Sequence, residues 1–290
     1  MGLRALTITH ATTEWHEAFF RFVPKVFPGL GFRAWQQYGG WDERYVSFAL
    51  ADGEHIVANA SLCRMDLVLS SQRIRGWQLG AVGTLPEYRR RGLQAGLWSR
   101  LLQHTVAGDL IFLFANHDVL DFYPRFGFQR AREAVFRTPC RVDPQGLPLR
   151  SLDIEQPADR ALLERIAANA QPVTDLFGAR DYGRIVLWYW TSFLPHALRY
   201  APECDAIFAV AQHAQRLHVL DILSAAPVDL SRFLPRLVTG PVTELEFAFT
   251  PDRYCPSATS EIEYTESALF VRGRHPLPTE PFKFPLLAQT

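Results

Sequence analysis

The chain has 290 residues, 48% of them hydrophobic, and its 30 Lys and Arg residues balance 30 Asp and Glu residues. That length can bury the cores of two domains or of one large domain. A formal net charge of zero gives no sign of a nucleic-acid partner or of an acidic disordered tail.

The N-terminal segment begins with a strand and a helix. Residues 3–10 predict the strand, and apolar residues at helical spacing from Trp15 to Val23 predict the helix. Pro24 is expected to end that helix, and a second short helical piece should hold Trp35. Two short helices are therefore expected before the main sheet.

The hydrophobic period then changes from helical to alternating. Residues 45–51 and 55–69 flank Asp52-Gly53, a strong turn signal between apolar runs. Residues 73–84 return as a third strand after a turn at Ser70-Ser71. This pattern predicts a three-strand antiparallel meander.

The meander leads into a second type of unit. Leucines at helical spacing predict a helix starting at about Gly92, and residues 110–116 predict a fully buried strand. A short helix near Pro124 and a strand over 129–140 should follow. The first domain, residues 1–142, is therefore expected to be α/β, with a mixed, mostly antiparallel sheet flanked by helices.

Residues 143–290 predict a second, smaller α/β domain after a linker at 143–148. Its elements repeat the order of the first half: helices, paired strands, a helix, a buried strand and a final strand. The expected segments are helices at 158–170, 183–194 and 228–238 and strands at 205–212, 216–224, 244–250 and 267–273. The repeat is architectural, because the two halves share no obvious sequence identity.

The stretch LGAVGTLPEYRRRGLQAG, residues 79–96, joins a strand to a helix through three arginines and a glycine. It could be a turn with a solvated basic face. It could also hold phosphate or pyrophosphate, because a helix N-terminus offers unpaired amides and the positive end of the helix dipole. The spacing matches neither the GxxxxGK[ST] phosphate loop nor the GxGxxG dinucleotide fingerprint.

Two motifs in this order resemble a known family. Arg89-x-x-Gly92-x-Gln94 opens the helix, and Asn116 is followed seven residues later by Tyr123 in FYPRFGF. Together they resemble the acetyl-CoA signature and the downstream motif of the GCN5-related N-acetyltransferase (GNAT) superfamily. The resemblance covers residues 3–140 and is closest to two-domain members of the enhanced-intracellular-survival type. Gln94 departs from the family, which has Gly or Ala there, and could crowd the pyrophosphate or point away from it.

The resemblance implies acetyl transfer from acetyl-CoA to a primary amine of an unidentified small-molecule or peptide acceptor, by direct attack in a ternary complex. A non-catalytic CoA- or metabolite-binding protein on the same fold is the alternative. The backbone expected to pair with the pantetheine arm is that of Val82, Gly83 and Thr84, with Gly83 leaving the arm unobstructed. The segment expected to hold the pyrophosphate comprises Arg89, Arg90, Arg91, Gly92, Leu93, Gln94 and Ala95.

The same resemblance gives roles to Asn116 and Tyr123. Asn116 would bond the pantetheine or orient the acetyl group, or else cap its strand. Tyr123 would protonate the departing CoA thiolate, or else be a core aromatic residue. No general base is singled out, and a water chain could replace one. The candidates by position are Glu14, His16, Glu17, Asp66, His117 and Asp118.

Between the strand at 216–224 and the helix at 228–238 there is no RxxGxG. A second cofactor is therefore not expected, and the second domain would close the acceptor cleft or form a homodimer contact. The cysteines fit no zinc template, and no metal is expected. Without a secretory leader or an apolar run of about 18 residues, the sequence predicts a cytoplasmic protein with no membrane partner.

Overall fold

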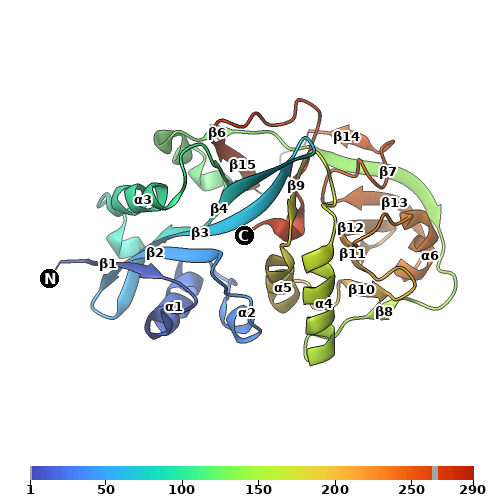
Figure 1. Ribbon diagram of the computed structural model, residues 1–290, viewed down its shortest axis with the longest axis horizontal. Coiled ribbons are helices and arrows are strands. Elements are labelled where there is room, and N and C mark those ends of the chain that lie inside the picture. The colour runs from blue at the N-terminus through green and yellow to red at the C-terminus, as the bar shows by residue number, and fades with distance from the viewer. Residues whose placement is uncertain (1, 263–266) are drawn as a thin grey trace.

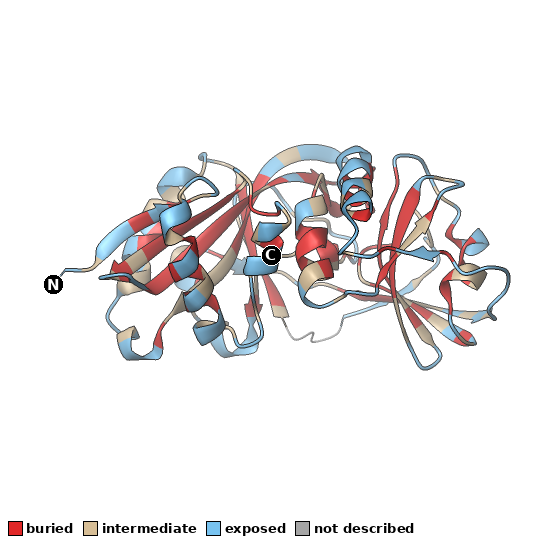
Figure 2. Ribbon diagram, turned by 90° about the horizontal axis from the view of Figure 1, so that it is seen from below, coloured by how far each residue is buried: buried red, intermediate tan, exposed pale blue. Residues whose placement is uncertain are grey.

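The computed structural model describes residues 2–262 and 267–290. Two β-sheets lie side by side, and helices α4 (Pro157–Asn169) and α5 (Gly183–Ser192) stand between them (Figure 1). Buried residues follow both sheets and the helix between them (Figure 2). The mixed α/β class predicted from the sequence is confirmed.

The first sheet has the strand order β1-β2-β3-β4-β5-β15-β6, and β9 pairs with β3 outside this path. Strands β2, β3 and β4 form the predicted antiparallel meander, and β4 pairs with β5 in parallel. The strands are β1 Arg4–Ile8, β2 Tyr45–Asp52, β3 His55–Leu69, β4 Gln72–Thr84, β5 Leu110–Asn116, β6 Gln129–Arg130, β9 Phe177–Arg180 and β15 Ser267–Arg272.

The second sheet has the order β14-β7-β13-β12-β11-β10-β8. It repeats the pattern of the first, because β10, β11 and β12 are antiparallel neighbours and β12 pairs with β13 in parallel. The strands are β7 Val135–Val142, β8 Arg150–Ser151, β10 Leu198–Ala201, β11 Ala206–His213, β12 Arg216–Leu223, β13 Val242–Phe247 and β14 Thr259–Glu261.

Each sheet contains a strand from the other half of the chain. Strand β7, predicted as part of the first domain, pairs with β13 in the second sheet. Strand β15, predicted as part of the second domain, pairs with β5 in the first sheet. The predicted strand over 129–140 is correspondingly split into β6 and β7. The two sheets thus do not divide the chain at residue 142, and the limits of the domains stay a prediction.

The helices differ from the sequence prediction in three places. Pro24 lies inside α1 and does not end it, because Phe19, Phe22 and Val23 bury one face of the helix and offset the lost backbone bond. The helix expected near Pro124 is two 3₁₀ turns. The helix expected at 228–238 is a 3₁₀ turn followed by α6. The remaining helix bounds are α1 His16–Val26, α2 Arg33–Gln37, α3 Leu93–His104 and α6 Leu234–Leu237.

The two faces of the first sheet have separate cores. Helix α3 packs in a cluster with Trp98, Leu113 and Tyr123, whereas α1, α2 and α5 share a larger cluster on other residues of the same sheet. No helix in the described ranges is long and apolar enough to cross a membrane.

Candidate functional site

Strands β4 and β5 pair over only part of their length. Their parallel register runs from Gly76 opposite Leu110 to Leu79 opposite Leu113. Beyond these residues β4 continues to Thr84 and β5 to Asn116, and within the described chain no strand joins the facing edges. The open edge of β4 can therefore accept an extended ligand arm by backbone hydrogen bonds.

A bulge marks the start of this open segment. Ala81 has φ +48°, and the register between β3 and β4 shifts here. Asn59 of β3 is fully buried, donates to the Ala81 carbonyl at 2.8 Å and accepts from Ser47 Oγ at 2.5 Å. Sequence reasoning missed Asn59, although a polar residue inside the apolar run HIVANASLC was a usable signal.

Helix α3 starts beside the open segment with an uncapped N-terminus. Gly92 is the N-cap residue with φ +73°, and it offers no side-chain cap. Among the described residues the amides of 90–94 have no acceptor, whereas the Ala95 amide donates to the Gly92 carbonyl at 3.1 Å. The amides of 90–94 are therefore available to an anion and the Ala95 amide is already used, and the amide cradle stays a prediction.

The three arginines of this turn have different surroundings. Arg89 Nε donates to the Thr84 carbonyl at 3.1 Å. Arg91 donates to the Glu87 carbonyl at 2.7 Å, and its guanidinium lies over the Tyr88 ring. Arg90 is exposed, has φ +62° and has no partner among the described residues. Arg90 is thus the arginine of the three whose guanidinium is free to meet an anion.

The Gln94 side chain turns toward β4. Its Nε2 donates to the Gly83 carbonyl at 2.8 Å and to Thr84 Oγ1 at 3.0 Å. Of the two orientations that the sequence left open, the side chain thus adopts the one directed away from the amides of its own helical turn. Gln94 joins the start of α3 to the open end of β4.

Gly83 has a structural reason different from the predicted one. A Cβ at this position would lie 2.4 Å from Val26 Cγ1 and 3.4 Å from an atom of the Phe27 ring. The glycine is therefore required by the packing of the chain around α1. Val82 has no cross-strand partner in the described register.

Of the two predicted catalytic residues, Asn116 ends β5 and Tyr123 begins the second of the two 3₁₀ turns that follow. Asn116 is exposed at the end of that strand. Tyr123 is 6% exposed, with ring centroids 5.6 Å from Phe270 and 6.1 Å from Trp98. Burial raises the pKa of the Tyr123 hydroxyl to about 12. The side chain has no hydrogen-bond partner among the described residues.

The candidate bases do not converge on one place. His16 is buried, with Nε2 2.8 Å from the Thr9 carbonyl and its ring stacked on Trp41. Glu17 is paired with Arg33, which lowers the pKa of that carboxyl. Asp66 alone among the candidates lines the pocket described next. The remaining candidates, Glu14, His117 and Asp118, are exposed.

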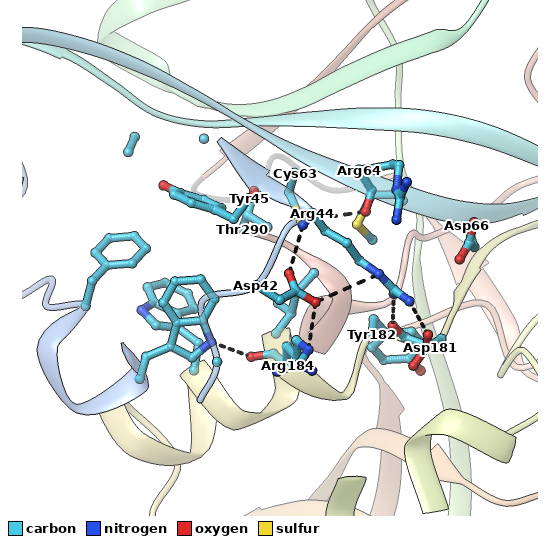
Figure 3. Close-up of a pocket in the computed structure, with 18 of the residues that line it drawn as sticks. Asp42, Arg44, Tyr45, Cys63, Arg64, Asp66, Asp181, Tyr182, Arg184 and Thr290 are labelled. Atoms are coloured by element: carbon cyan, nitrogen blue, oxygen red, sulfur yellow. Dashed lines mark hydrogen bonds and ion pairs between the residues drawn. The ribbon is translucent and has the colours of Figure 1, made fainter. Parts of the chain in front are cut away.

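A pocket lies on the α5 side of the first sheet (Figure 3). Its walls border about 640 Å³ of empty space, a figure that includes open solvent, and the cavity proper is only about 50 Å³. Gly80 and Ala81, directly before the open segment of β4, line it together with Tyr182 and Trp188 of the second half. The pocket thus borders the same bulge as the open edge.

Sequence reasoning missed this pocket because its walls come from distant segments. Arg44 donates to the Asp181 carbonyl at 2.7 Å across 137 positions of sequence and also forms an ion pair with the Asp181 carboxylate. Asp42 accepts from Arg184 Nε at 2.7 Å. Figure 3 shows these four side chains as one chain of contacts between the loop before β2 and the second half.

One family model matches the part of the chain that contains the open edge of β4 and the start of α3. Residues 7–131 match the model of the acetyltransferase (GNAT) domain. These residues form a GNAT domain. The match supports N-acetyl transfer as the general activity and confirms the family predicted from Arg89, Gly92, Asn116 and Tyr123.

Solved structures resemble the chain over almost all of its length. A probable N-acyltransferase from Enterococcus faecalis V583 has a TM-score of 0.58 and 15% identity, covering 94% of this chain and 72% of the other. Eis1 from Mycobacterium abscessus has a TM-score of 0.53 and 15% identity, and the match covers 92% of this chain and 73% of the other. A GCN5-related N-acetyltransferase from Kribbella flavida has a TM-score of 0.52 and 14% identity, and the match covers 94% of this chain and 71% of the other. At these identities the likeness concerns the fold. No curated protein sequence matches the chain.

In the ranges that the structure describes, no group of three or more His, Cys, Asp or Glu side chains is placed to hold a metal ion. The four cysteines are free thiols, Cys63 being buried.

Proposed function

We propose that the protein is an acetyl-CoA-dependent N-acetyltransferase that transfers the acetyl group to a primary amine by direct attack within a ternary complex. One observation carries the proposal: the open edge of β4 and the uncapped start of α3 meet at the same place. The Gln94 side chain bonds the two together. An extended arm that ends in a pyrophosphate matches both features at once.

On this proposal the cofactor is held mainly by backbone. The residues Val82, Gly83 and Thr84 pair with the pantetheine arm, and the amides of 90–94 bind the pyrophosphate. Arg90 adds a charge-assisted donor. The carbonyls of Gly83 and Thr84 already accept from Gln94 and Arg89. The groups left for the pantetheine arm are therefore the backbone amide and carbonyl of Val82 and the backbone amides of Gly83 and Thr84.

Tyr123 is the proposed general acid. Its hydroxyl is protonated at neutral pH, as that of an ordinary tyrosine is, so it has a proton to give to the sulfur that leaves when the tetrahedral intermediate collapses. Asn116, at the exposed end of β5, is proposed to bond the pantetheine or orient the acetyl group. Backbone amides polarise the thioester carbonyl during the attack. The acceptor amine comes from the pocket beside Ala81.

A CoA- or metabolite-binding protein without turnover is the second candidate. The observation that favours it is the aromatic surroundings of Tyr123, which would suit a purely structural tyrosine equally well. Two measurements on the same preparation separate the candidates: calorimetric titration with CoA, and consumption of acetyl-CoA with a panel of amines. Binding together with amine-dependent consumption is expected. Binding without consumption would favour the second candidate, and no binding would contradict both.

We also infer a cytoplasmic enzyme, because all four cysteines are unpaired thiols. One cofactor site per chain is proposed, with the second half closing the acceptor pocket. Whether the protein forms a homodimer is a question for measurement in solution.

A further inference from the structure

The bulge in β4 takes one peptide group out of the hydrogen-bond ladder of the sheet. Between two regular pairs of β3 and β4, the residues Ala81 and Val82 face the single residue Ala60. Ala81 has φ +48°, a conformation that residues other than glycine rarely adopt. Contacts around the bulge must therefore hold the backbone in this form.

The Asn59 side chain provides the contact that holds the bulge. Asn59 is fully buried, and its Nδ2 donates to the Ala81 carbonyl at 2.8 Å and to Ser61 Oγ at 2.9 Å. Its Oδ1 accepts from Ser47 Oγ at 2.5 Å. An amide side chain has two N–H donors and one carbonyl oxygen, so every polar group of this side chain has a partner. Because Ser47 donates to Oδ1, it is Nδ2 that faces the Ala81 carbonyl.

The hydrogen bond from Asn59 also sets the direction of the next backbone amide. The peptide bond between Ala81 and Val82 is trans, and in a trans peptide the carbonyl and the N–H point in opposite directions. Since the Ala81 carbonyl accepts from a side chain of β3, the Val82 N–H points away from β3, toward the edge of β4 that β5 leaves open. Val82 has no partner in the register of β3 and β4, so a ligand carbonyl can accept from its amide.

On the proposed function, the reactive end of acetyl-CoA reaches this amide. A pyrophosphate on the amides of 90–94 places the start of the pantetheine arm beside Thr84. The arm then follows β4 toward Leu79, where the pairing with β5 closes the edge. The thioester is at the far end of the arm from the pyrophosphate. Its carbonyl therefore comes to the bulge, beside Val82.

We propose that Asn59 is a positioning residue for acetyl transfer. Its side chain holds the Ala81 carbonyl and thereby directs the Val82 N–H at the thioester carbonyl, on which negative charge develops when the amine attacks. Ser47 supports this role because it fixes the orientation of the Asn59 amide. The inference rests on the proposed function, since it needs acetyl-CoA bound along β4. Asn59 acts only through the backbone and exchanges no proton with the substrate.

The Asn59→Ala variant tests this role with acetyl-CoA alone as the probe, because slow hydrolysis of the thioester forms the same oxyanion. Loss of an oxyanion donor lowers kcat by about 10²–10³-fold, so loss of its orientation should lower the kcat of hydrolysis by about 10–100-fold. The Kd of CoA, measured by calorimetry, should stay close to that of the unmodified protein, because CoA has no thioester carbonyl. A merely structural role would not separate kcat from Kd in this way.

The infrared band of the bound thioester gives a second readout, one that does not depend on turnover. A hydrogen bond to a carbonyl lowers its stretching frequency. The carbonyl band of isotope-labelled acetyl-CoA should therefore lie at lower frequency on the unmodified protein than in solution. In Asn59→Ala the difference between bound and free acetyl-CoA should be smaller.

Two further variants separate positioning from a loss of stability. Ser47→Ala removes the donor to Asn59 Oδ1 and leaves the bond to Ala81 possible, so it should lower kcat by a smaller factor than Asn59→Ala does. Thr250→Val is the matched control. Thr250 is 3% exposed and bonds the backbone of Lys283, outside β3 and β4. Thr250→Val should lower the Tm and leave both kcat and the carbonyl band unchanged.

Three results would overturn the role of Asn59. Two of them are a kcat within twofold of the unmodified protein and an unchanged carbonyl band in folded Asn59→Ala. The third is a loss of CoA affinity as large as the loss of kcat, which would make Asn59 a structural residue of the sheet. If Asn59→Ala does not fold, unchanged kcat and band in Ser47→Ala would contradict the proposal. Failure of the unmodified protein to bind CoA would instead contradict the proposed function, so the two failures are distinguishable.

Discussion

The two halves of the chain contain the same strand–helix–strand unit, and only one of them is open to a ligand. In the first, β4 leads through a glycine turn into the 12-residue helix α3 and then to β5. In the second, β12 leads through a 3₁₀ turn into the four-residue helix α6 and then to β13. Both pairs of strands are parallel and both pairings stop early, at Leu79 and at Val219.

The helix starts of the two units differ in what satisfies their amides. In the second unit the Asp229 carboxylate accepts from the Ser231 amide at 3.1 Å and from its hydroxyl at 2.6 Å. A carboxylate thus satisfies an amide at the start of the 3₁₀ turn that precedes α6. In the first unit Gly92 has no side chain to do the same, and the amides of 90–94 are left for a ligand.

The edges of β4 and β12 also differ in what satisfies their backbone groups. Beyond Val219, the Ala248 amide donates to the Val219 carbonyl, and the Leu286 amide donates to the Ala248 carbonyl. The second unit therefore uses its own chain to cover the edge that the first leaves open. On the proposed function, the fold alone does not make a cofactor site, and an uncovered strand edge and an uncapped helix are needed as well.

The largest effect on CoA binding should come from placing a carboxylate at the start of α3 in the first unit, as Asp229 places one in the second unit. Gly92→Glu should abolish CoA binding, because it places a negative charge against the pyrophosphate. Calorimetric titration with CoA measures this. Gly92→Asn is the matched control, since asparagine tolerates φ +73° better than other residues and adds no charge. A Cβ at this position meets nothing within 4 Å. Unchanged affinity in a folded Gly92→Glu protein would contradict the cradle.

The second effect concerns the tyrosine that follows each unit. Tyr123 comes seven residues after Asn116, and Tyr254 comes seven residues after Phe247 at the end of β13. Tyr123→Phe should lower kcat by about 10²–10⁴-fold with CoA affinity nearly unchanged, because general acid catalysis contributes that much. Tyr254→Phe is the matched control and should keep kcat.

The same variants decide between a catalytic and a structural Tyr123. A kcat within twofold of the unmodified protein would contradict the catalytic role and leave Tyr123 as a core aromatic residue. Because its hydroxyl has no hydrogen-bond partner among the described residues, the Phe variant should then keep its Tm. A test with a primary amine and a test of slow acetyl-CoA hydrolysis should agree.

The part of the site that is contiguous in sequence could be predicted from it. The strand, the glycine turn and the helix of residues 79–96 follow from local signals, since the turn chemistry and the hydrophobic period both lie within one stretch. The direction of the Gln94 side chain could not be predicted, because it depends on where the end of β4 lies.

The parts built from distant segments could not be predicted. Strands β7 and β15 each lie between two other strands of their sheet, and nothing in their own residues says which sheet they join. The pocket beside Ala81 depends on another pairing of distant segments, because β9 pairs with β3 and so brings Asp181 to Arg44. The packing of Gly83 against Val26 could not be predicted either, because Val26 is 57 positions away in sequence.

Substitution of Gly83 should have an effect of intermediate size on the free energy of unfolding. The second unit has buried Leu223 four residues beyond Val219, where the first has Gly83 four residues beyond Leu79. Gly83→Ala should lower the free energy of unfolding by about 1–3 kcal/mol, because the new Cβ overlaps Val26. Gly96→Ala in α3 is the control and should raise it by up to about 1 kcal/mol. Denaturant unfolding measures both, and equal stabilities would contradict the packing argument.

The smallest effect should come from removing the cap of the second unit. Asp229→Ala should lower the free energy of unfolding by about 0.5–2 kcal/mol, the usual contribution of an N-cap side chain. CoA should still saturate at one site per chain in both proteins. The reason is that α6 is a single turn and the neighbouring strand edge stays covered by residues 248 and 286, so an uncapped helix alone does not make a site. A second CoA site in Asp229→Ala only would show that the carboxylate alone excluded the cofactor. Two CoA sites per chain in the unmodified protein would show that the second unit also binds CoA. That result would contradict the comparison of the two units, on which the other predictions depend.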